Sequence, residues 1–342
     1  MYKDVQLLAR LPRPAIFILC AGFERRVTRA AQLLKLNQID ARRVITIVYE
    51  GGGEENLRNL KLLRKIATTL CRSEGVVEVS TSNLSEVATQ IESVGAEECE
   101  VVLDATGMSR MIMMRLLAIV YNAGVRPIIV YTEAKEYYPT KTQFRKLTKG
   151  GARPPEDAFL TLNQFEKAEI LYSMHCEVEE VAGVNGYMLP NYPLMLIAFL
   201  TFKRGRLAAV FNSYEANVRV LIKSVPVRPD LRWRSEAIEI PNLDLIEDST
   251  ELVELETLDW HVTYDYLKSL YERENNRYKC NFVLAPLGSK MQTIGAWLFA
   301  RERPEIRVVT STPKTLYHKR YSRGFGQTFL IDDLPKLPIA QR

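Results

Sequence analysis

The segment DATGMSR, residues 104–110, contains a glycine, two hydroxyl side chains and a basic residue. Together these residues could bind an anion. Thr106 and Ser109 offer hydroxyl groups, and Gly107 permits a turn with positive φ. The helix expected after this turn would present unpaired N–H groups to an anion, and Arg110 could clamp a phosphate there. The segment therefore predicts a phosphate-binding turn. The alternative is a plain turn in which Gly107 only reverses the chain.

A second candidate is the segment CAGFERR, residues 20–26, which contains Gly22 and the bases Arg25 and Arg26. It has one glycine where the dinucleotide fingerprint Gly-x-Gly-x-x-Gly needs three, so its backbone cannot make the usual close approach to a pyrophosphate. The glycine-rich EGGGEEN, residues 50–56, lacks the Lys-Ser/Thr pair of a Walker loop and is interpreted as a flexible turn. Nicotinamide and flavin dehydrogenases are therefore disfavoured, and no cofactor is expected.

Two further segments in the second half could contact a ligand. LGSKMQT, residues 287–293, places Gly288, Ser289 and Lys290 at the expected start of a helix, which suits a phosphate-binding turn. The alternative is that Lys290 is an ordinary solvated residue of the first helical turn. YSRGFGQTF, residues 321–329, mixes aromatic residues, a base and two glycines. This mixture is typical of a segment that wraps a ligand or nucleic acid, or of a terminal loop that packs on the fold.

Five short apolar runs, typical of β-strands, alternate with segments of helical periodicity between residues 15 and 132. The runs are residues 15–20, 43–49, 76–79, 100–103 and 127–132. Such alternation predicts a Rossmann-like parallel sheet with helices on both faces. In the common strand order the chain order reverses between the first and fourth strands, and ligands bind at that point. We therefore expect Gly22–Arg26 to lie beside Asp104–Arg110.

The second half repeats this plan. Residues 194–211 read as a strand, then a Phe with clustered charge, then a helix, which is the order that begins near residue 16. Residues 282–317 match residues 101–138 in the order of their elements. The sequence thus predicts an α/β protein with two Rossmann-like units, an internal duplication. We expect an N-terminal domain over residues 1–150, a linker near 140–157 that is rich in Lys, Gly, Thr and Pro, and a second domain over 158–342.

Composition sets the remaining expectations. The chain has 342 residues, of which 47% are hydrophobic, and its formal net charge is +5. Residues 301–342 alone have an excess of basic over acidic residues of the same size. This basic C-terminal segment suits an anionic partner, nucleic acid included. Five cysteines without a Cys-x-x-Cys pair, three histidines and apolar runs too short for a bilayer predict a cytoplasmic protein with no membrane contact and no metal site.

The DATGMSR turn at the end of a fourth strand resembles the Asp-x-Thr-Gly-Gly-Thr-Lys turn of CRISPR-associated Rossmann-fold (CARF) ligand-sensing domains. It is also similar to that of the related SAVED sensors, which fuse two such units. Met108, Ser109 and Arg110 replace glycine, threonine and lysine. The resemblance implies that Thr106, Gly107, Ser109 and Arg110 contact a cyclic oligonucleotide. It also implies a nucleotide-binding sensor or adaptor of a prokaryotic antiviral defence system, with a protein partner as effector.

An enzyme is the other function class that the residues leave open. Asp104 with Glu133-Ala134-Lys135 spells the acidic pair and lysine of a metal-dependent nuclease, in which two carboxylates hold Mg²⁺. That set normally lies on adjacent antiparallel strands, whereas a long helix separates the two parts here. We prefer Glu133 as an acceptor for a sugar hydroxyl or an amine. The alternative is a metal-dependent enzyme that acts on a nucleotide or nucleic acid through Asp104 and Glu133.

Overall fold

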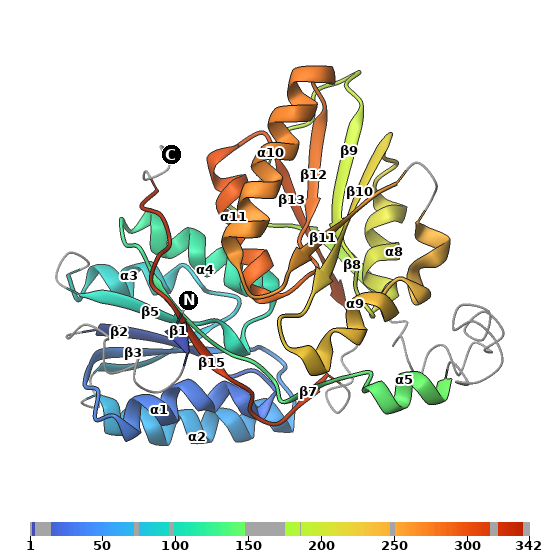
Figure 1. Ribbon diagram of the computed structural model, residues 1–342. Coiled ribbons are helices and arrows are strands. Elements are labelled where there is room, and N and C mark those ends of the chain that lie inside the picture. The colour runs from blue at the N-terminus through green and yellow to red at the C-terminus, as the bar shows by residue number, and fades with distance from the viewer. Residues whose placement is uncertain are drawn as a thin grey trace. The chain divides into compact units, whose positions relative to one another are not determined.

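The computed structural model describes most of the chain: residues 2–3, 15–71, 75–95, 99–147, 175–184, 186–246, 250–314 and 321–337. The chain divides into two compact units, each built around one large sheet (Figure 1). Unit 1 comprises residues 1–138 and 318–342, and unit 2 comprises residues 139–317.

Unit 1 contains a seven-stranded sheet in the order β1-β15-β6-β5-β2-β3-β4. Its strands are β1 (Tyr2–Lys3), β2 (Ala15–Cys20), β3 (Ala41–Val48), β4 (Val76–Ser80), β5 (Glu100–Asp104), β6 (Ile128–Thr132) and β15 (Thr328–Ile331). The five strands from β6 to the edge strand β4 are parallel, while β15 runs antiparallel to both β6 and β1. Counted from β2, the parallel strands therefore lie in the order third, second, first, fourth, fifth, and the order reverses between β2 and β5 as predicted.

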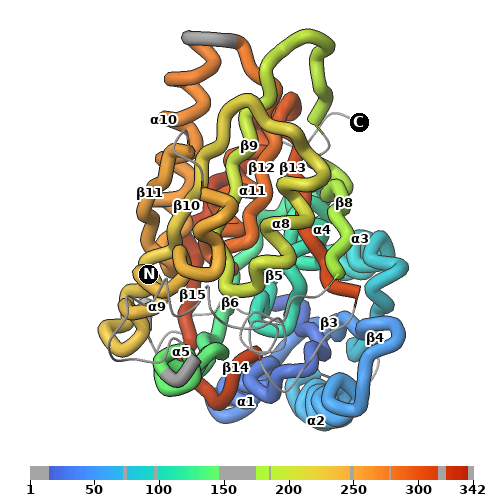
Figure 2. The backbone as a smooth tube through the Cα atoms, turned by 90° about the vertical axis from the view of Figure 1, so that its right-hand side faces the viewer, coloured from blue at the N-terminus to red at the C-terminus, as the bar shows by residue number. Residues whose placement is uncertain are grey.

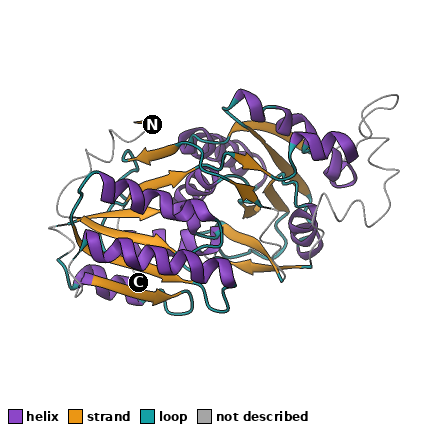
Figure 3. Cartoon of the chain, turned by 90° about the horizontal axis from the view of Figure 1, so that it is seen from below, coloured by secondary structure: helices purple, strands orange, loops and turns teal. Residues whose placement is uncertain are grey.

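Helices cover both faces of this sheet (Figure 1). They are η2 (Arg25–Thr28), α1 (Arg29–Leu36), α2 (Glu54–Leu70), α3 (Glu86–Glu92), η4 (Ala105–Gly107) and α4 (Arg110–Asn122). One face packs on α1 and α2 (Figure 3). The leucines and alanines of these helices form a common core with Phe17 and Leu19 of β2. The other face carries α3 and α4. Every residue of β2 is buried, as expected for a parallel strand between two layers of helices.

Unit 2 repeats the strand order of unit 1. Its six-stranded sheet runs β11-β10-β9-β12-β13-β8, with five parallel strands and β8 antiparallel at the edge (Figure 2). The strands are β8 (Cys176–Glu180), β9 (Leu194–Phe199), β10 (Val218–Val225), β11 (Glu251–Glu256), β12 (Asn281–Ala285) and β13 (Arg307–Pro313). The helices are α5 (Lys141–Leu147), α8 (Arg204–Ser213), η5 (Pro229–Leu231), α9 (Trp233–Ala237), η6 (Ile240–Leu245), α10 (Trp260–Tyr278) and α11 (Lys290–Glu302).

The predicted fold class, two Rossmann-like α/β units, is confirmed by these two sheets. Two details differ from the expectation. Residues 141–147 of the expected linker form helix α5, and residues 148–157 lie outside the described residues. The C-terminal segment was assigned to the second domain, but β15 pairs with β6 and the segment belongs to unit 1. No helix in the described part of the chain combines the length and the apolar character of a membrane span.

A two-stranded ribbon completes unit 1. It pairs β7 (Glu136–Tyr137) with β14 (Ser322–Arg323) in antiparallel fashion. The N–H of Tyr138 donates to the carbonyl of Tyr321 at 3.1 Å and extends the pairing by one residue. The ribbon thus joins the segment that follows β6 to the segment that precedes β15.

Candidate ligand-binding site

The loops after β2 and β5 are in direct backbone contact at the carboxyl end of the first sheet. A Cβ atom on Gly22 would lie 2.6 Å from the carbonyl oxygen of Gly107, and one on Gly107 would overlap the carbonyl oxygen of Cys20. Any larger residue at either position would push the loops apart, because backbone atoms cannot move aside as a side chain can. The structure therefore brings together the two segments, 20–26 and 104–110, that the sequence predicts to be neighbours.

Tyr49, which follows β3, fixes the turn after β5. Its hydroxyl donates to the carbonyl of Gly107 at 3.2 Å and accepts from the N–H of Ser109 at 2.6 Å. Burial raises the pKa of Tyr49 well above its usual range, so the phenol keeps the proton that it donates. From the sequence, Tyr49 was predicted only to end a strand. Its place at the carboxyl end of the strand next to β2 is the signal that could have identified it.

Asp104 and Thr106 hold the same turn from inside. The carboxylate of Asp104 accepts from the N–H of Thr106 at 3.0 Å, and the hydroxyl of Thr106 accepts from the N–H of Thr132 at 2.9 Å. Both predicted residues are 2% exposed. The hydroxyl of Thr106 thus joins the end of β5 to the end of β6.

Ser109 and Arg110 form the start of α4. The hydroxyl of Ser109 caps the helix by accepting from the N–H of Ile112 at 3.2 Å. Arg110 is the first helical residue, and the first turn contains no acidic side chain. The positive end of the helix dipole is therefore not neutralised by a carboxylate in that turn, and an anion would be favoured there.

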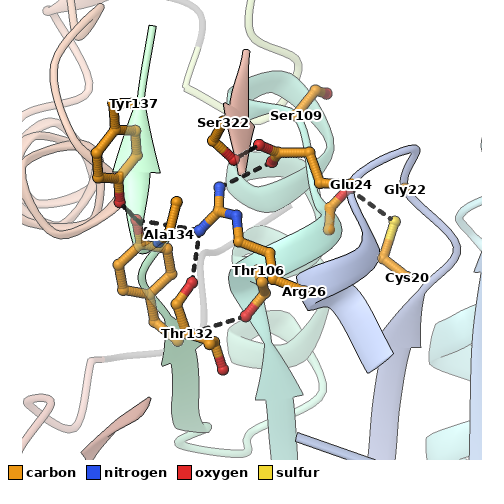
Figure 4. Close-up of polar contacts among 12 residues, drawn as sticks. Cys20, Gly22, Glu24, Arg26, Thr106, Ser109, Thr132, Ala134, Tyr137 and Ser322 are labelled. Atoms are coloured by element: carbon orange, nitrogen blue, oxygen red, sulfur yellow. Dashed lines mark hydrogen bonds and ion pairs between the residues drawn. The ribbon is translucent and has the colours of Figure 1, made fainter. Parts of the chain in front are cut away.

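Arg26 is buried instead of lying open to a ligand. Figure 4 shows its guanidinium between Glu24 and Thr132. It donates to a carboxylate oxygen of Glu24 at 2.8 Å and to the carbonyl of Thr132, and the hydroxyl of Ser322 donates to the other oxygen of Glu24. Burial alone would lower the pKa of Arg26, but Glu24 and two neighbouring tyrosines raise it well above its usual range. Arg26 is therefore a charged anchor for the first loop.

Arg25 is exposed next to this anchor. Two carboxamides of α2, which the sequence analysis did not single out, hold the same loop. Asn56 donates to the carbonyl of Ala21 at 2.8 Å, and Asn59 donates to the carbonyl of Gly22 at 2.8 Å. Both asparagines are buried within a helix, where they are poor helix formers, and this unusual placement was the available signal.

Glu133 lies under the C-terminal segment. Its N–H donates to the carbonyl of Gln327, and its own carbonyl accepts from the N–H of Gly326, both at 2.8 Å. The segment YSRGFGQTF therefore packs as an extended chain along residues 133–138. Glu133 is 6% exposed.

In unit 2, the contacts of Gly288 and Ser289 are explained by the unit's own packing. Ser289 and Gln292 form a capping box, in which each side chain binds the other residue's N–H, at 3.1 and 2.9 Å. The buried Gln292 also accepts from the hydroxyl of Ser224 at 2.8 Å and donates to a carbonyl of β11 at 3.3 Å. A Cβ on Gly288 would overlap the amide of Gln292. Lys290 is the first residue of α11.

The acidic residues that the structure describes have another arrangement than that of a metal centre. Among the residues that the structure describes, no group of three or more His, Cys, Asp or Glu side chains is placed to hold a metal ion. Asp104 and Glu133 follow neighbouring strands, but the carboxylate of Asp104 already accepts from the backbone of its own turn.

Comparison with known proteins adds a likeness in fold. No family model and no curated protein match the chain. The chain is similar to a Type III CRISPR defence DNA nuclease activated by cyclic oligoadenylate. The TM-score is 0.50 at 10% identity over 86% of this chain, which spans 65% of the length of that protein.

Other solved structures are similar at lower scores. They include the cytoplasmic domain of a prokaryotic cation chloride cotransporter, with a TM-score of 0.25, 9% identity and coverage of 88% of this chain and 96% of that one. A universal stress protein from Archaeoglobus fulgidus has a TM-score of 0.22, 10% identity and coverage of 87% and 97%. At 10% identity, the likeness to the CRISPR nuclease concerns the fold alone.

Proposed function

We propose that this protein is a nucleotide-binding sensor or adaptor whose phosphorylated ligand binds at the carboxyl ends of β2 and β5. The observation that carries the proposal is the contact of the two loops at the reversal of strand order, through Gly22 and Gly107, beside the start of α4. Open α/β sheets bind ligands at that point, and a helix N-terminus there favours an anion.

The residues divide into two roles in this proposal. Gly22, Arg25, Ser109 and Arg110 contact the ligand, with the bases and the first N–H groups of α4 on its phosphates. The buried residues position these contacts: Arg26 and Asn59 hold the first loop, while Asp104, Thr106 and Tyr49 hold the second. Glu133 stays a proposed acceptor for a sugar hydroxyl, and Gly288, Ser289 and Lys290 stay a proposed second phosphate turn.

A cyclic oligonucleotide is the ligand class that we propose to test first. The CARF-like turn and the fold similarity to a nuclease that cyclic oligoadenylate activates both support it. The same two arguments support a role in prokaryotic antiviral defence. The common strand order of the units supports an internal duplication. In a sensor, binding shifts the state of a partner protein and leaves the ligand unchanged.

Calorimetric titration with cyclic oligoadenylate, linear oligoadenylate and ATP tests the proposal. Arg110→Gln should weaken binding by about 1.5–3 kcal/mol, because it removes a charge-assisted hydrogen bond. The unfolding temperature without ligand should change little, because Arg110 is a partly exposed base at the positive end of a helix dipole, where a cation contributes little to folding. Lys290→Gln in unit 2 is the matched variant and tests the second turn. Unchanged affinity with a lowered unfolding temperature would assign Arg110 to the fold.

The enzyme alternative has its own test, although no specific contact favours it. A metal-dependent enzyme would turn over nucleotides or DNA in Mg²⁺ or Mn²⁺, and the double substitution Asp104→Ala, Glu133→Ala would abolish the turnover. The measurement is product formation by the unsubstituted chain and by the double variant under the same conditions.

A further inference from the structure

An exposed phenylalanine lies at the tip of the C-terminal segment of unit 1. Phe325 has 39% of its surface exposed, although it belongs to a segment whose backbone is hydrogen-bonded to the fold. Burying a phenyl ring is favourable, so a ring that stays outside needs a local cause. The flanking glycines provide that cause.

Gly324 and Gly326 hold Phe325 at the surface. Gly324 has a φ of +72°, which a residue with a side chain rarely adopts, and its carbonyl accepts from the N–H of Lys135 at 3.5 Å. A Cβ on Gly326 would lie 2.8 Å from the carbonyl oxygen of Ala134. Both glycines thus press directly on residues 134–135. The residue between them is presented by a fixed backbone and cannot reach the core by a simple rotation.

One basic side chain lies over the ring, and two others belong to the segments that adjoin it. The guanidinium of Arg29 lies over it, 6.0 Å from the ring centroid. Arg25 precedes Arg29 by one turn of the continuous helical segment η2–α1 and is exposed. Lys135 is also exposed, and its Cβ lies 3.0 Å from the Cβ position of Gly324.

Three acidic residues lie near the tip, and one of them, Glu133 under Gly326, is buried. Glu136 pairs with Arg323 at 3.0 Å, and Glu24 is buried against Arg26 and Ser322. The surface around Phe325 therefore carries a surplus of positive charge. It lies at the same end of the sheet as the proposed ligand site, and Arg25 belongs to both.

We infer that Phe325, Arg25, Arg29 and Lys135 form a subsite for an unpaired nucleobase and its phosphodiester. The base stacks on the ring of Phe325, as bases do on exposed aromatic side chains in proteins that bind single strands. The phosphate pairs with the positively charged side chains of Arg25, Arg29 and Lys135. This inference rests on the proposed function and deepens it: the ligand is an oligonucleotide, because a mononucleotide bound at α4 would leave this subsite empty.

Fluorescence anisotropy with labelled oligonucleotides tests the subsite in the full chain. The probes are a short linear oligoadenylate and a long polythymidylate strand, which distinguish a small oligonucleotide ligand from single-stranded nucleic acid. Inorganic tripolyphosphate serves as a competitor that has phosphates and no base. The variants are Phe325→Ala, Phe325→Tyr and Arg29→Gln, with Leu57→Ala as the matched control because Leu57 is another exposed apolar residue, 55% exposed, on α2 of the same unit.

Phe325→Ala should weaken binding of at least one oligonucleotide by about tenfold or more, because stacking of one base is lost. Phe325→Tyr should retain the affinity, and Leu57→Ala should match the unsubstituted chain. Arg29→Gln should weaken binding and reduce its dependence on salt. Tripolyphosphate binding should be the same with and without the Phe325 ring.

Three results would overturn the inference, and they differ in what else they overturn. Oligonucleotide binding that is unaffected by Phe325→Ala but lost in Arg110→Gln would reject the subsite and leave the proposed function standing. No binding of any oligonucleotide to the unsubstituted chain would reject both. An equal loss in Phe325→Ala and Leu57→Ala would also reject the subsite, because it would reveal a general effect of removing exposed apolar groups.

Discussion

The loops after the first parallel strand differ between the two units, although the sheets share one strand order. In unit 1 the ion pair of this segment, Arg26 with Glu24, is nearly sealed from water, with side chains 8% and 13% exposed. In unit 2 the pair of Arg204 with Asp244 is open, with side chains 30% and 61% exposed. The same topology thus supports a rigid, desolvated loop in one unit and a solvated loop in the other.

The turns after the fourth parallel strand differ in how the start of the next helix is held. In unit 2 the helix start is held by the capping box of Ser289 and Gln292, and these two side chains also bond to Thr257, Ser224 and Leu255. In unit 1 the third helical residue is Ile112, which has no polar side chain for such a box, and a hydroxyl from another strand, that of Tyr49, holds Ser109 instead. The contrast teaches that one fold can hold the same turn in two ways: unit 2 carries both members of a capping box on the helix, whereas unit 1 depends on the hydroxyl of Tyr49.

Removing the buried anchor should produce the largest effect. Arg26→Leu leaves the carboxylate of Glu24 buried without its cation, and we expect a loss of about 3–5 kcal/mol in the free energy of unfolding. Arg204→Leu in unit 2 should cost less than about 1 kcal/mol, because its pair is solvated. Urea denaturation followed by circular dichroism measures both. Equal losses would erase the contrast between the two loops.

The close approach of the glycines should give the next largest effect. Gly107→Ala forces a methyl group against the carbonyl of Cys20, so we expect a loss of about 1–3 kcal/mol together with weaker nucleotide binding. Gly288→Ala in unit 2 meets the buried side chains of Gln292 and Phe199, and we expect a somewhat smaller loss because neither of these atoms belongs to the backbone. Thermal unfolding of the two variants shows which loses more stability, and titration measures their nucleotide binding. A greater loss of stability in Gly288→Ala would contradict the prediction.

Removing the two helix caps should change the free energy of unfolding by smaller amounts. Ser289→Ala removes a cap, half of a capping box and a hydrogen bond to the carbonyl of Thr257, so we expect a loss of about 1–2 kcal/mol. Ser109→Ala should cost about 0.5–1 kcal/mol, because the N–H of Ser109 keeps its bond to Tyr49. Chemical denaturation without ligand gives both values. A larger loss for Ser109→Ala would mean that unit 1 depends on its cap as much as unit 2 does.

The smallest effect concerns pH. The pKa of Tyr49 is raised by burial, so the folded chain holds this proton more tightly than the unfolded chain. The stabilisation from this group is complete below a pH of about 10 and is lost as the pH rises above that value. The stability advantage of the unsubstituted chain over Tyr49→Phe should therefore shrink between pH of about 9 and about 11. A constant difference would show that Tyr49 ionises equally in both states.

The sequence predicted what depends on local pattern. Buried parallel strands such as Ala15–Cys20 are continuous apolar runs, and the reversal of strand order follows from their alternation with helices. This was enough to place the loops of Gly22 and Gly107 together. The strand β15 was misassigned because four residues, Thr328–Ile331, carry no signal for the sheet that they join.

Contacts between distant residues were not predictable from one sequence. The hydroxyl of Tyr49 reaches Gly107 and Ser109 across 58 and 60 positions, and Ser322 reaches Glu24 across 298. Nothing in the local pattern around Arg26 separates a base that binds phosphate from one that is buried on a carboxylate. The neighbouring Glu24 is present in the sequence, but only the fold shows that both side chains turn inward.

The pairing of β15 with β6 has a consequence for how the chain folds as it leaves the ribosome. All of unit 2, residues 139–317, is translated before Thr328–Ile331 can add to the sheet of unit 1. Until then β6 is an open edge that can pair with other chains, and β1, whose described pairing is with β15, has no strand to join. The unit that begins translation first is therefore completed last.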